Sequence, residues 1–234
     1  PIELILKQLC SQGIYDHVEG GLSRYTVDEN WLIPHFEKML YDNAQFVLLI
    51  SKFLKINKND YFEKKLIQTI EFINNNFLNT KSNLLGSAYD ADSDGEEGKY
   101  YVFTYNELKD IKDIELYFDV SANGNWENKI ILREIKVPPE SIVTELKDLR
   151  RKKKKPFFDN KIQLDLNCLW ISALISAEKI LPKNNYLRIA EIYYNNLEKL
   201  FFKEDRLYHT NSKTSVFLED YAYAIAMLLD LSDQ

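Results

Sequence analysis

The sequence predicts an all-α protein built from helical hairpins, with one small β excursion, in a single domain spanning residues 1–234. Three observations favour this class. Apolar residues recur at helical spacing along most of the chain, glycine is scarce at 7 residues, and tyrosine (15) and phenylalanine (13) are abundant. Few glycines and many large side chains favour long packed helices over a turn-rich β-fold.

The clearest helix is predicted for residues 35–56. Pro34 suits the position where a helix begins, because its missing N–H would have no partner there. The apolar stripe consists of Phe36, Met39, Leu40, Val47, Ile50 and Leu54. On such a helix His35 and Asp42, seven residues apart, would share one edge of the stripe, and Glu37 would point to the opposite side.

Other elements follow from capping and turn signals. Asp60 with Glu63, Thr104 with Glu107, and Pro138-Pro139 each suit the start of a helix. Helices are predicted for residues 61–77, 140–154, 164–181, 186–202 and 218–231. The third of these is apolar on nearly all sides, as in a helix buried on two faces. Short strands are predicted for residues 100–103 and 129–132.

Composition argues against several classes of protein. The formal net charge of −6 does not suit general nucleic-acid binding, which needs a basic surface. No apolar run is long enough to span a membrane, and no signal-peptide pattern opens the sequence, so we expect a cytoplasmic protein. Cys10 and Cys168 form no CxxC motif, and we interpret both as reduced core residues.

The segment "DADSDGEEGKYY" (residues 90–101) resembles the start of an EF-hand loop. Asp90, Asp92, Asp94 and Gly95 fit the first half, but Tyr101 occupies the position of the bidentate glutamate. We therefore predict no tight calcium binding. Two interpretations remain open: a solvated acidic turn, or a carboxylate-rich loop that lines a polar pocket.

Two further features of the sequence could indicate sites. The basic run at residues 150–155 ends a predicted helix, where cations complement the helix dipole, and we interpret it as a solvated helix end. His17, His35 and His209 have no metal-ligand spacing, so we expect no metal and no cofactor.

Two blocks of sequence, "GIYDHVEGGLSRYTVDENWLIPHFEKMLYDNAQ" and "GSAYDADSDGEEGKYYVFT", closely resemble the spermatogenesis-associated, thioredoxin-domain-containing proteins. The resemblance continues more weakly through "RKKKKPFFDNKIQLDLNCLWISAL" and "FLEDYAYAIAMLLDL". It implies an (α/α) toroid similar to six-hairpin glycosidases and N-acylglucosamine 2-epimerases, with a thioredoxin-like domain upstream in the full-length protein. The chain departs from the family at Tyr89, where glutamate is usual, and at Leu166 and Cys168, which flank Asn167 in place of tryptophan and glycine.

The inner helices of such a toroid surround an axial pocket. The resemblance therefore implies that the polar residues line this one pocket. Sugar chemistry there needs carboxylates or a histidine for proton transfer, and aromatic faces for sugar rings. The catalytic candidates are His35, Glu37, Asp42, Asp90 and Asp92. The substrate-binding candidates are Arg24, Tyr25, Asp28, Glu96, Glu97, Asn167 and Asp220.

Each candidate also has a structural interpretation. His35 suits a hydrogen-bonded helix start, Glu37 and Asp42 suit ion pairs with Arg24 or Lys38, and Glu219-Asp220 suit a cap of the last helix. Two functions therefore stay open. One is an epimerase-like or glycosidase-like enzyme that acts on a sugar or sugar derivative. The other is a non-catalytic scaffold that binds a small molecule or a protein.

Chain length predicts the number of hairpins. A hairpin needs roughly 40–50 residues, so six would need about 240–300. A chain of 234 residues that includes a β excursion is expected to hold about four, as an incomplete toroid. We expect an exposed apolar edge near one terminus, at residues 2–9 or 224–231.

Overall fold

The computed structural model describes residues 1–202 and 206–234. The chain forms two compact units, each made of two segments. Unit 1 comprises Pro1–Lys38 and Tyr89–Phe157, and unit 2 comprises Met39–Ala88 and Phe158–Gln234. Strands β3 (Lys38–Met39) and β6 (Ala88–Tyr89) span two of the boundaries. That residues 1–234 make one partial toroid domain stays a prediction.

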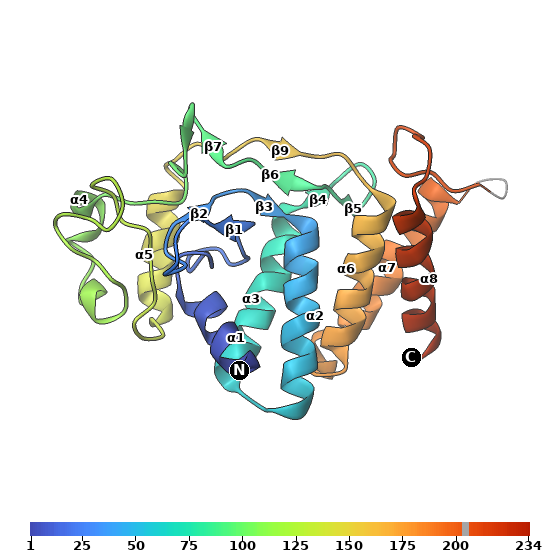
Figure 1. The fold of residues 1–234 in the computed structure, drawn as a ribbon, viewed down its shortest axis with the longest axis horizontal. Helices are drawn as coiled ribbons and strands as arrows, with labels where there is room; N and C mark the ends of the chain where they lie inside the picture. The colour runs from blue at the N-terminus through green and yellow to red at the C-terminus, as the bar shows by residue number, and fades with distance from the viewer. Residues whose placement is uncertain (203–205) are drawn as a thin grey trace. The chain divides into compact units, whose positions relative to one another are not determined.

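Unit 2 is a group of five helices (Figure 1): α2 (Leu40–Ile56), α3 (Asp60–Asn76), α6 (Leu164–Glu178), α7 (Tyr186–Phe201) and α8 (Leu218–Ser232). Helix α6 packs against α2, α7 and α8, and 11 of its 15 residues are buried, which confirms the prediction of a helix buried on more than one face. Helices α2–α3 and α6–α7 are two successive hairpins, the latter joined through the 3-10 helix η2 (Pro182–Asn184). Strands β4 (Leu78–Asn79), β5 (Leu84–Leu85) and β9 (Phe158–Asp159) complete the unit.

Unit 1 has fewer helices and more irregular backbone. Its elements are α1 (Ile2–Ser11), β1 (Tyr25–Thr26), β2 (Pro34–His35), β7 (Asp92–Ser93), β8 (Glu96–Glu97), α4 (Tyr105–Leu108), η1 (Ile114–Leu116) and α5 (Glu140–Arg150). A cluster of buried apolar residues, among them Phe103, Phe118 and Leu146, forms its core. The capping box of Thr104 and Glu107 at the start of α4 is confirmed. Helix α1 has no counterpart among the predicted helices.

The predicted helix at residues 35–56 is wrong over its first five residues. Residues 34–35 form β2, which pairs antiparallel with β1, Tyr25 opposite His35. The backbone N–H of Arg24 also donates to the carbonyl of Glu37. These inter-strand hydrogen bonds replace a first helical turn, and α2 begins only at Leu40. Because the segment is extended, His35 and Glu37 lie on the same side of the chain rather than on opposite sides.

The acidic segment is a β-hairpin and not an EF-hand. Asp92 pairs with Glu97 and Ser93 with Glu96, and Asp94 and Gly95 form the two-residue turn with φ of 54° and 75°. Positive φ at both turn residues is what a tight hairpin requires. The strand predicted at residues 100–103 is reduced to a single bridge, between Phe103 and Ile130.

The interior of unit 1 contains one carboxylate that binds two cations. Asp16 accepts hydrogen bonds from Arg150 Nη1 at 2.5 and 2.6 Å and from Lys38 Nζ at 2.7 Å. All three residues are buried, Lys38 completely. Arg150 Nη2 also donates to the carbonyl of Tyr101 at 3.0 Å. The interpretation of residues 150–155 as a solvated helix end is therefore wrong at Arg150, which a distant carboxylate draws into the core.

Burial shifts the pKa values of all three groups in this cluster. Burial by itself would raise the pKa of Asp16, but Arg150 and Lys38 more than offset it and hold the pKa well below its usual value. For Arg150, burial works toward a lower pKa and Asp16 reverses the direction, so the guanidinium stays charged. Burial also lowers the pKa of Lys38, and Asp16 opposes this effect. Asp16 and Arg150 are thus a buried ion pair, and neither can be removed without leaving the charge of the other buried.

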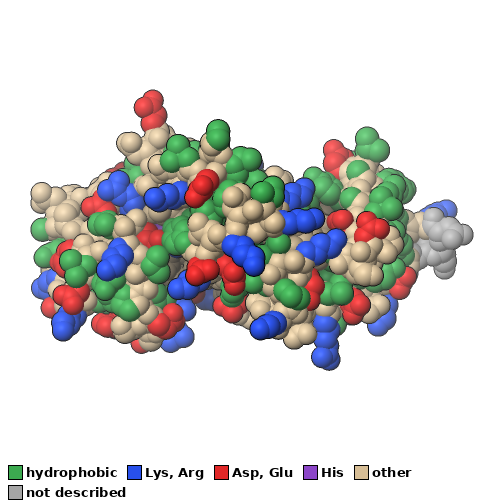
Figure 2. Space-filling model, turned by 90° about the horizontal axis from the view of Figure 1, so that it is seen from below, with side chains coloured by type: hydrophobic (Ala, Val, Ile, Leu, Met, Phe, Trp, Pro, Cys, Tyr) green, Lys and Arg blue, Asp and Glu red, His purple; other side chains and the backbone are tan. Residues whose placement is uncertain are grey.

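Apolar side chains are exposed on both terminal helices. In α1 these are Ile2, Leu4 and Ile5, and in α8 they include Leu218, Ile225 and Leu229. An exposed apolar edge near a terminus was expected, and both candidate helices have one. On the face shown in Figure 2, basic and acidic side chains are interspersed. Within the described residues, no helix is long and apolar enough to cross a bilayer.

The substitution Asp16→Asn is expected to destabilise the protein strongly, because it removes the buried carboxylate that binds both Arg150 and Lys38 and leaves Arg150 with the more distant carboxylate of Glu19, at 3.7 Å. We expect the free energy of unfolding, measured by urea denaturation at pH 7, to fall by about 3–5 kcal/mol. Asp148→Asn is the matched control, since the Asp148–Arg151 pair is exposed and should contribute at most about 0.5 kcal/mol. Equal losses in the two variants would contradict a special role for Asp16.

The difference in unfolding free energy between wild type and Asp16→Asn is expected to depend on pH. Because the pKa of Asp16 is lowered in the folded state, its contribution is present above the unfolded pKa of about 3.9 and is lost as pH falls through the folded pKa. The stability difference between wild type and Asp16→Asn should therefore be constant near neutrality and shrink only below about pH 4. A difference that shrinks between pH 8 and 6 would show that another group titrates instead.

The hairpin is expected to bind calcium no more tightly than about 10⁻⁵ M, which is the weak end of the sensor range. Its carboxylates are divided: Asp94 pairs with Lys99 and Lys154, whereas Glu97 contacts His35. Calorimetric titration of wild type and of an Asp92→Asn/Asp94→Asn variant should give the same small heats. A tight site that the double variant abolishes would overturn this expectation.

Candidate functional site

The strongest candidate site in unit 1 surrounds His35. Its Nδ1 lies 2.8 Å from Glu97 Oε1, and its Nε2 lies 3.3 Å from Glu37 Oε2. The ring of Tyr25 stacks on the imidazole at a centroid distance of 5.0 Å and an interplanar angle of 24°. Arg24 Nη1 completes the group 3.1 Å from the same oxygen of Glu37. Five of the predicted site residues are thus brought together.

Backbone pairing positions each member of this site. Tyr25 and His35 are directly opposed in the β1–β2 ladder, and opposed side chains of an antiparallel pair lie on the same face. Glu37 follows two residues after His35 in extended backbone, and Glu97 comes from the acidic hairpin. Asp92 is paired directly with Glu97 across the hairpin, so it shares the face that carries Glu97.

The geometry gives His35 a carboxylate at each ring nitrogen. A proton on Nδ1 can be donated to Glu97, and a proton on Nε2 lies near Glu37. The ring can therefore exchange protons with a carboxylate on either side. The His35 side chain is 26% exposed, so a ligand can reach it. Tyr25 and Arg24 are more exposed still, and provide an aromatic face and a planar cation at the rim.

Other predicted site residues have structural roles. The carboxylate of Asp28 accepts hydrogen bonds from the backbone N–H groups of Asn30, Leu32 and Ile33 at 2.6–3.3 Å, which closes the turn before β2. Asn167 is buried, donates to the carbonyls of Leu85 and Gln163 and accepts from the N–H of Leu85. Both side chains hold backbone, and the substrate-binding role predicted for each stays a prediction.

The remaining predicted residues have other described surroundings. Asp90 is exposed and accepts from the backbone N–H of Asp92. Glu96 belongs to the opposite face of the hairpin and pairs with Lys129. Asp42 lies in the first turn of α2, which belongs to unit 2. Catalytic and binding roles for all of these residues stay predictions.

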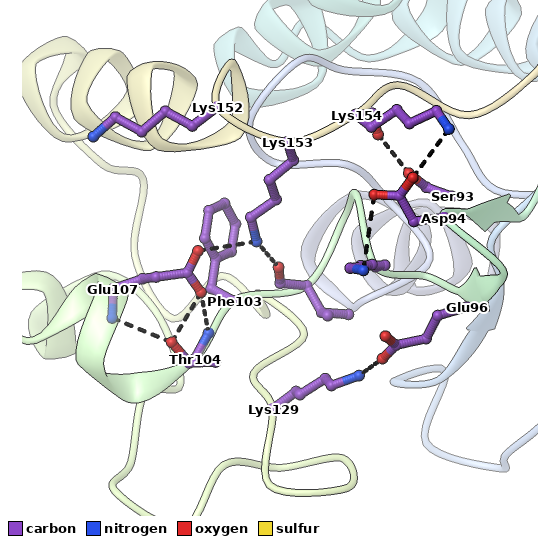
Figure 3. Close-up of a pocket in the computed structure, with 12 residues that line it drawn as sticks. Ser93, Asp94, Glu96, Phe103, Thr104, Glu107, Lys129, Lys152, Lys153 and Lys154 are labelled. Atoms are coloured by element: carbon purple, nitrogen blue, oxygen red, sulfur yellow. Dashed lines mark hydrogen bonds and ion pairs between the residues drawn. The ribbon is translucent and has the colours of Figure 1, made fainter.

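Glu96 lines a cavity of about 390 Å³ whose walls carry five lysines (Figure 3). Val102 and Phe103 form the apolar part of its lining. Lys153 crosses Phe103 with its Nζ 4.4 Å from the ring centroid, pairs with Glu107 at 3.3 Å and donates to the carbonyl of Val102. Four of the five lysines pair with Asp94, Glu96 or Glu107, so charges of both signs alternate in a lining that holds five lysines and three carboxylates.

Unit 2 contains a second group in which a histidine meets carboxylates. Asp165, His209 and Asp220 each offer an atom within 4.8 Å of the others, an arrangement that could hold a metal ion. His209 Nδ1 lies 2.9 and 3.1 Å from the two oxygens of the buried Asp220. Of these residues only Asp220 was predicted as a site residue. Sequence spacing gives no signal for the others, because a loop and two helix starts meet here only in the folded chain.

The predicted capping role of Asp220 is also confirmed. Its Oδ2 accepts from the backbone N–H of Phe217 at 2.8 Å, at the start of α8. The second oxygen remains directed to His209. One side chain therefore serves as helix cap and as partner of the imidazole.

Comparisons with known proteins agree with this fold. No family model matches the chain. Human spermatogenesis-associated protein 20 is 25% identical over 97% of the chain and 36% of its own length, and the mouse protein is 37% identical over 112 residues, 45% of the chain. The chain thus spans well under half the length of these relatives. A solved structure of a sugar epimerase from a ruminal bacterium covers 98% of the chain, and 49% of its own length, at 12% identity and a TM-score of 0.58.

At that identity the structural match shows the fold alone, while the sequence matches show common ancestry. The resemblance inferred from the sequence is thereby confirmed: the chain is a homologue of spermatogenesis-associated protein 20, with the mostly helical fold of the six-hairpin glycosidase-like sugar epimerases.

Proposed function

We propose that the chain is a carbohydrate-active domain of the epimerase or isomerase type, and that His35 transfers the proton. The observation that carries the proposal is the imidazole with a carboxylate at each ring nitrogen, 2.8 and 3.3 Å away, beneath an exposed tyrosine ring. The sugar epimerase of similar fold supports the same reaction class by analogy.

The proposed reaction begins with removal of the C–H proton beside the sugar carbonyl. His35 takes this proton while the electron pair moves to the carbonyl oxygen, which gains a proton from solvent and gives an enediol. Return of the proton from His35 to the former carbonyl carbon gives the isomer, and delivery of a solvent proton to the opposite face of the deprotonated carbon gives the epimer. Glu37 and Glu97 hold the imidazole and exchange protons with it, so that it is reset after each step.

The other residues of the group would bind the sugar. Tyr25 offers an aromatic face for a pyranose or open-chain sugar, and Arg24 offers hydrogen-bond donors for hydroxyl or carboxylate oxygens. The thioredoxin-like domain expected upstream and a cytoplasmic location belong to this proposal as predictions for the full-length protein.

A non-catalytic binding module is the second candidate, and one observation favours it. Arg24, Glu37, His35 and Glu97 form a continuous chain of ion pairs, which suits a rigid structural cluster as well as a proton relay. In that case the same exposed tyrosine and arginine would bind a sugar without turnover.

The proposal predicts solvent-proton exchange in sugars. The chain is incubated in D₂O with a panel of aldoses, ketoses and N-acylated amino sugars. We expect deuterium to replace the proton next to the carbonyl of at least one of these sugars, which proton NMR measures as loss of that signal. His35→Gln should slow this exchange by about 10²–10⁴-fold, the usual contribution of a general acid–base group. Asp148→Asn, a surface change outside the site, should leave it unaltered.

The two candidates give different results in the same experiment. A sugar that raises the melting temperature without any deuterium incorporation would favour the binding module. Exchange that persists in folded His35→Gln would show that the reaction does not use this histidine.

A further inference from the structure

The group formed by Asp165, His209 and Asp220 is held by backbone interactions from three parts of unit 2. Gln163 and Thr210 form an antiparallel bridge, and the N–H of Leu164 donates to the carbonyl of His209 at 2.9 Å. These bonds fix the loop before α8 against the start of α6. The capping contact of Asp220 then fixes the start of α8 at the same place.

We propose that Asp165, His209 and Asp220 form a binding site for one divalent transition-metal ion, with zinc as the preferred ion. One imidazole nitrogen and two carboxylate oxygens form a ligand set that zinc accepts, with metal–ligand distances of about 2.0–2.2 Å. Two ligands at such distances and at ordinary coordination angles lie about 3 Å apart. The 2.9 Å between His209 Nδ1 and Asp220 Oδ1 already matches this separation.

The other ring nitrogen of His209 also has a partner that fixes the ring. The amide nitrogen of Gln163 lies 3.2 Å from His209 Nε2, and the amide oxygen accepts from the hydroxyl of Ser87 at 2.8 Å. With the amide oriented in this way it donates to Nε2, which leaves the ring proton on Nδ1, facing Asp220. A metal ion would replace that proton, while Gln163 continues to fix the ring orientation.

Asp165 supplies a separate indication that a cation is required. Its Oδ1 is buried and has no hydrogen-bond partner among the described residues. Two carboxylates thus meet beside the imidazole of His209, and a divalent ion would stabilise both.

The ligand set argues for some ions over others. Calcium takes six to eight oxygen ligands, and magnesium usually keeps several waters and few protein ligands, so neither suits an imidazole with two carboxylates. Three protein ligands would leave at least one position of a zinc ion for water or a ligand. The His209 side chain is 16% exposed, which gives that position access to solvent.

The test uses the full chain, stripped of metal by a chelator and titrated with zinc chloride by calorimetry. We expect one ion per chain with micromolar or tighter affinity, and a rise in melting temperature on binding. His209→Gln and Asp165→Asn should each weaken the affinity by at least about tenfold. His35→Gln is the matched control, because His35 is the other partly exposed histidine that lies between carboxylates.

Asp165→Asn keeps the proposal testable if His209→Gln fails to fold. Removing a desolvated charge should leave the melting temperature of the metal-free protein unchanged or higher, while the zinc-induced rise is lost. These opposite effects distinguish a ligand from a residue that only supports the fold. Absence of a 1:1 site in the wild type, unchanged affinity in Asp165→Asn, or loss of binding in His35→Gln would overturn the proposal. None of these outcomes depends on sugar turnover.

Discussion

The buried carboxylate of Asp16 joins three segments that are far apart in sequence. It binds Lys38, which directly follows Glu37, and Arg150, the last residue of α5. Because Arg150 also donates to the carbonyl of Tyr101, the segment after the acidic hairpin is held as well. The strand that carries His35 and the hairpin that carries Glu97 are therefore both anchored close to one ionic cluster. Because burying these charges is costly, each one needs its partner. The positions of His35 and Glu97 therefore depend on an intact Asp16 cluster.

The acidic hairpin divides its charges between two faces. Glu97 contacts His35, and the adjacent Glu96 pairs with Lys129 on the wall of the lysine-lined cavity. This division follows from the two-residue period of a strand, which sends neighbouring side chains to opposite faces. An acidic sequence that resembles a calcium loop thus provides two separate environments, because its oxygens never converge on one point.

In each unit a histidine is brought to carboxylates by main-chain pairing. His35 is placed by the β1–β2 ladder, and His209 by the bridge between Gln163 and Thr210. The surroundings differ. The His35 group includes an arginine and an exposed aromatic ring, which suit an organic ligand. The His209 group has two carboxylates, one of them with an unsatisfied buried oxygen, which suit a cation.

The sequence by itself determined the helices of unit 2, the capping box at Thr104 and the resemblance to spermatogenesis-associated protein 20, because apolar periodicity, caps and motifs are local properties of the chain. It also identified His35, Glu37, Arg24, Tyr25 and Glu97 as candidates, through the family motifs. Tertiary structure alone decided that His35 is in a strand, that Arg150 is buried, and that Asp165, His209 and Asp220 meet. Each of these depends on partners distant in sequence: Tyr25 for His35, Asp16 for Arg150, and two helix starts for His209. Long-range hydrogen bonds and ion pairs produce no periodic pattern in the sequence, so they can be identified only in the folded chain.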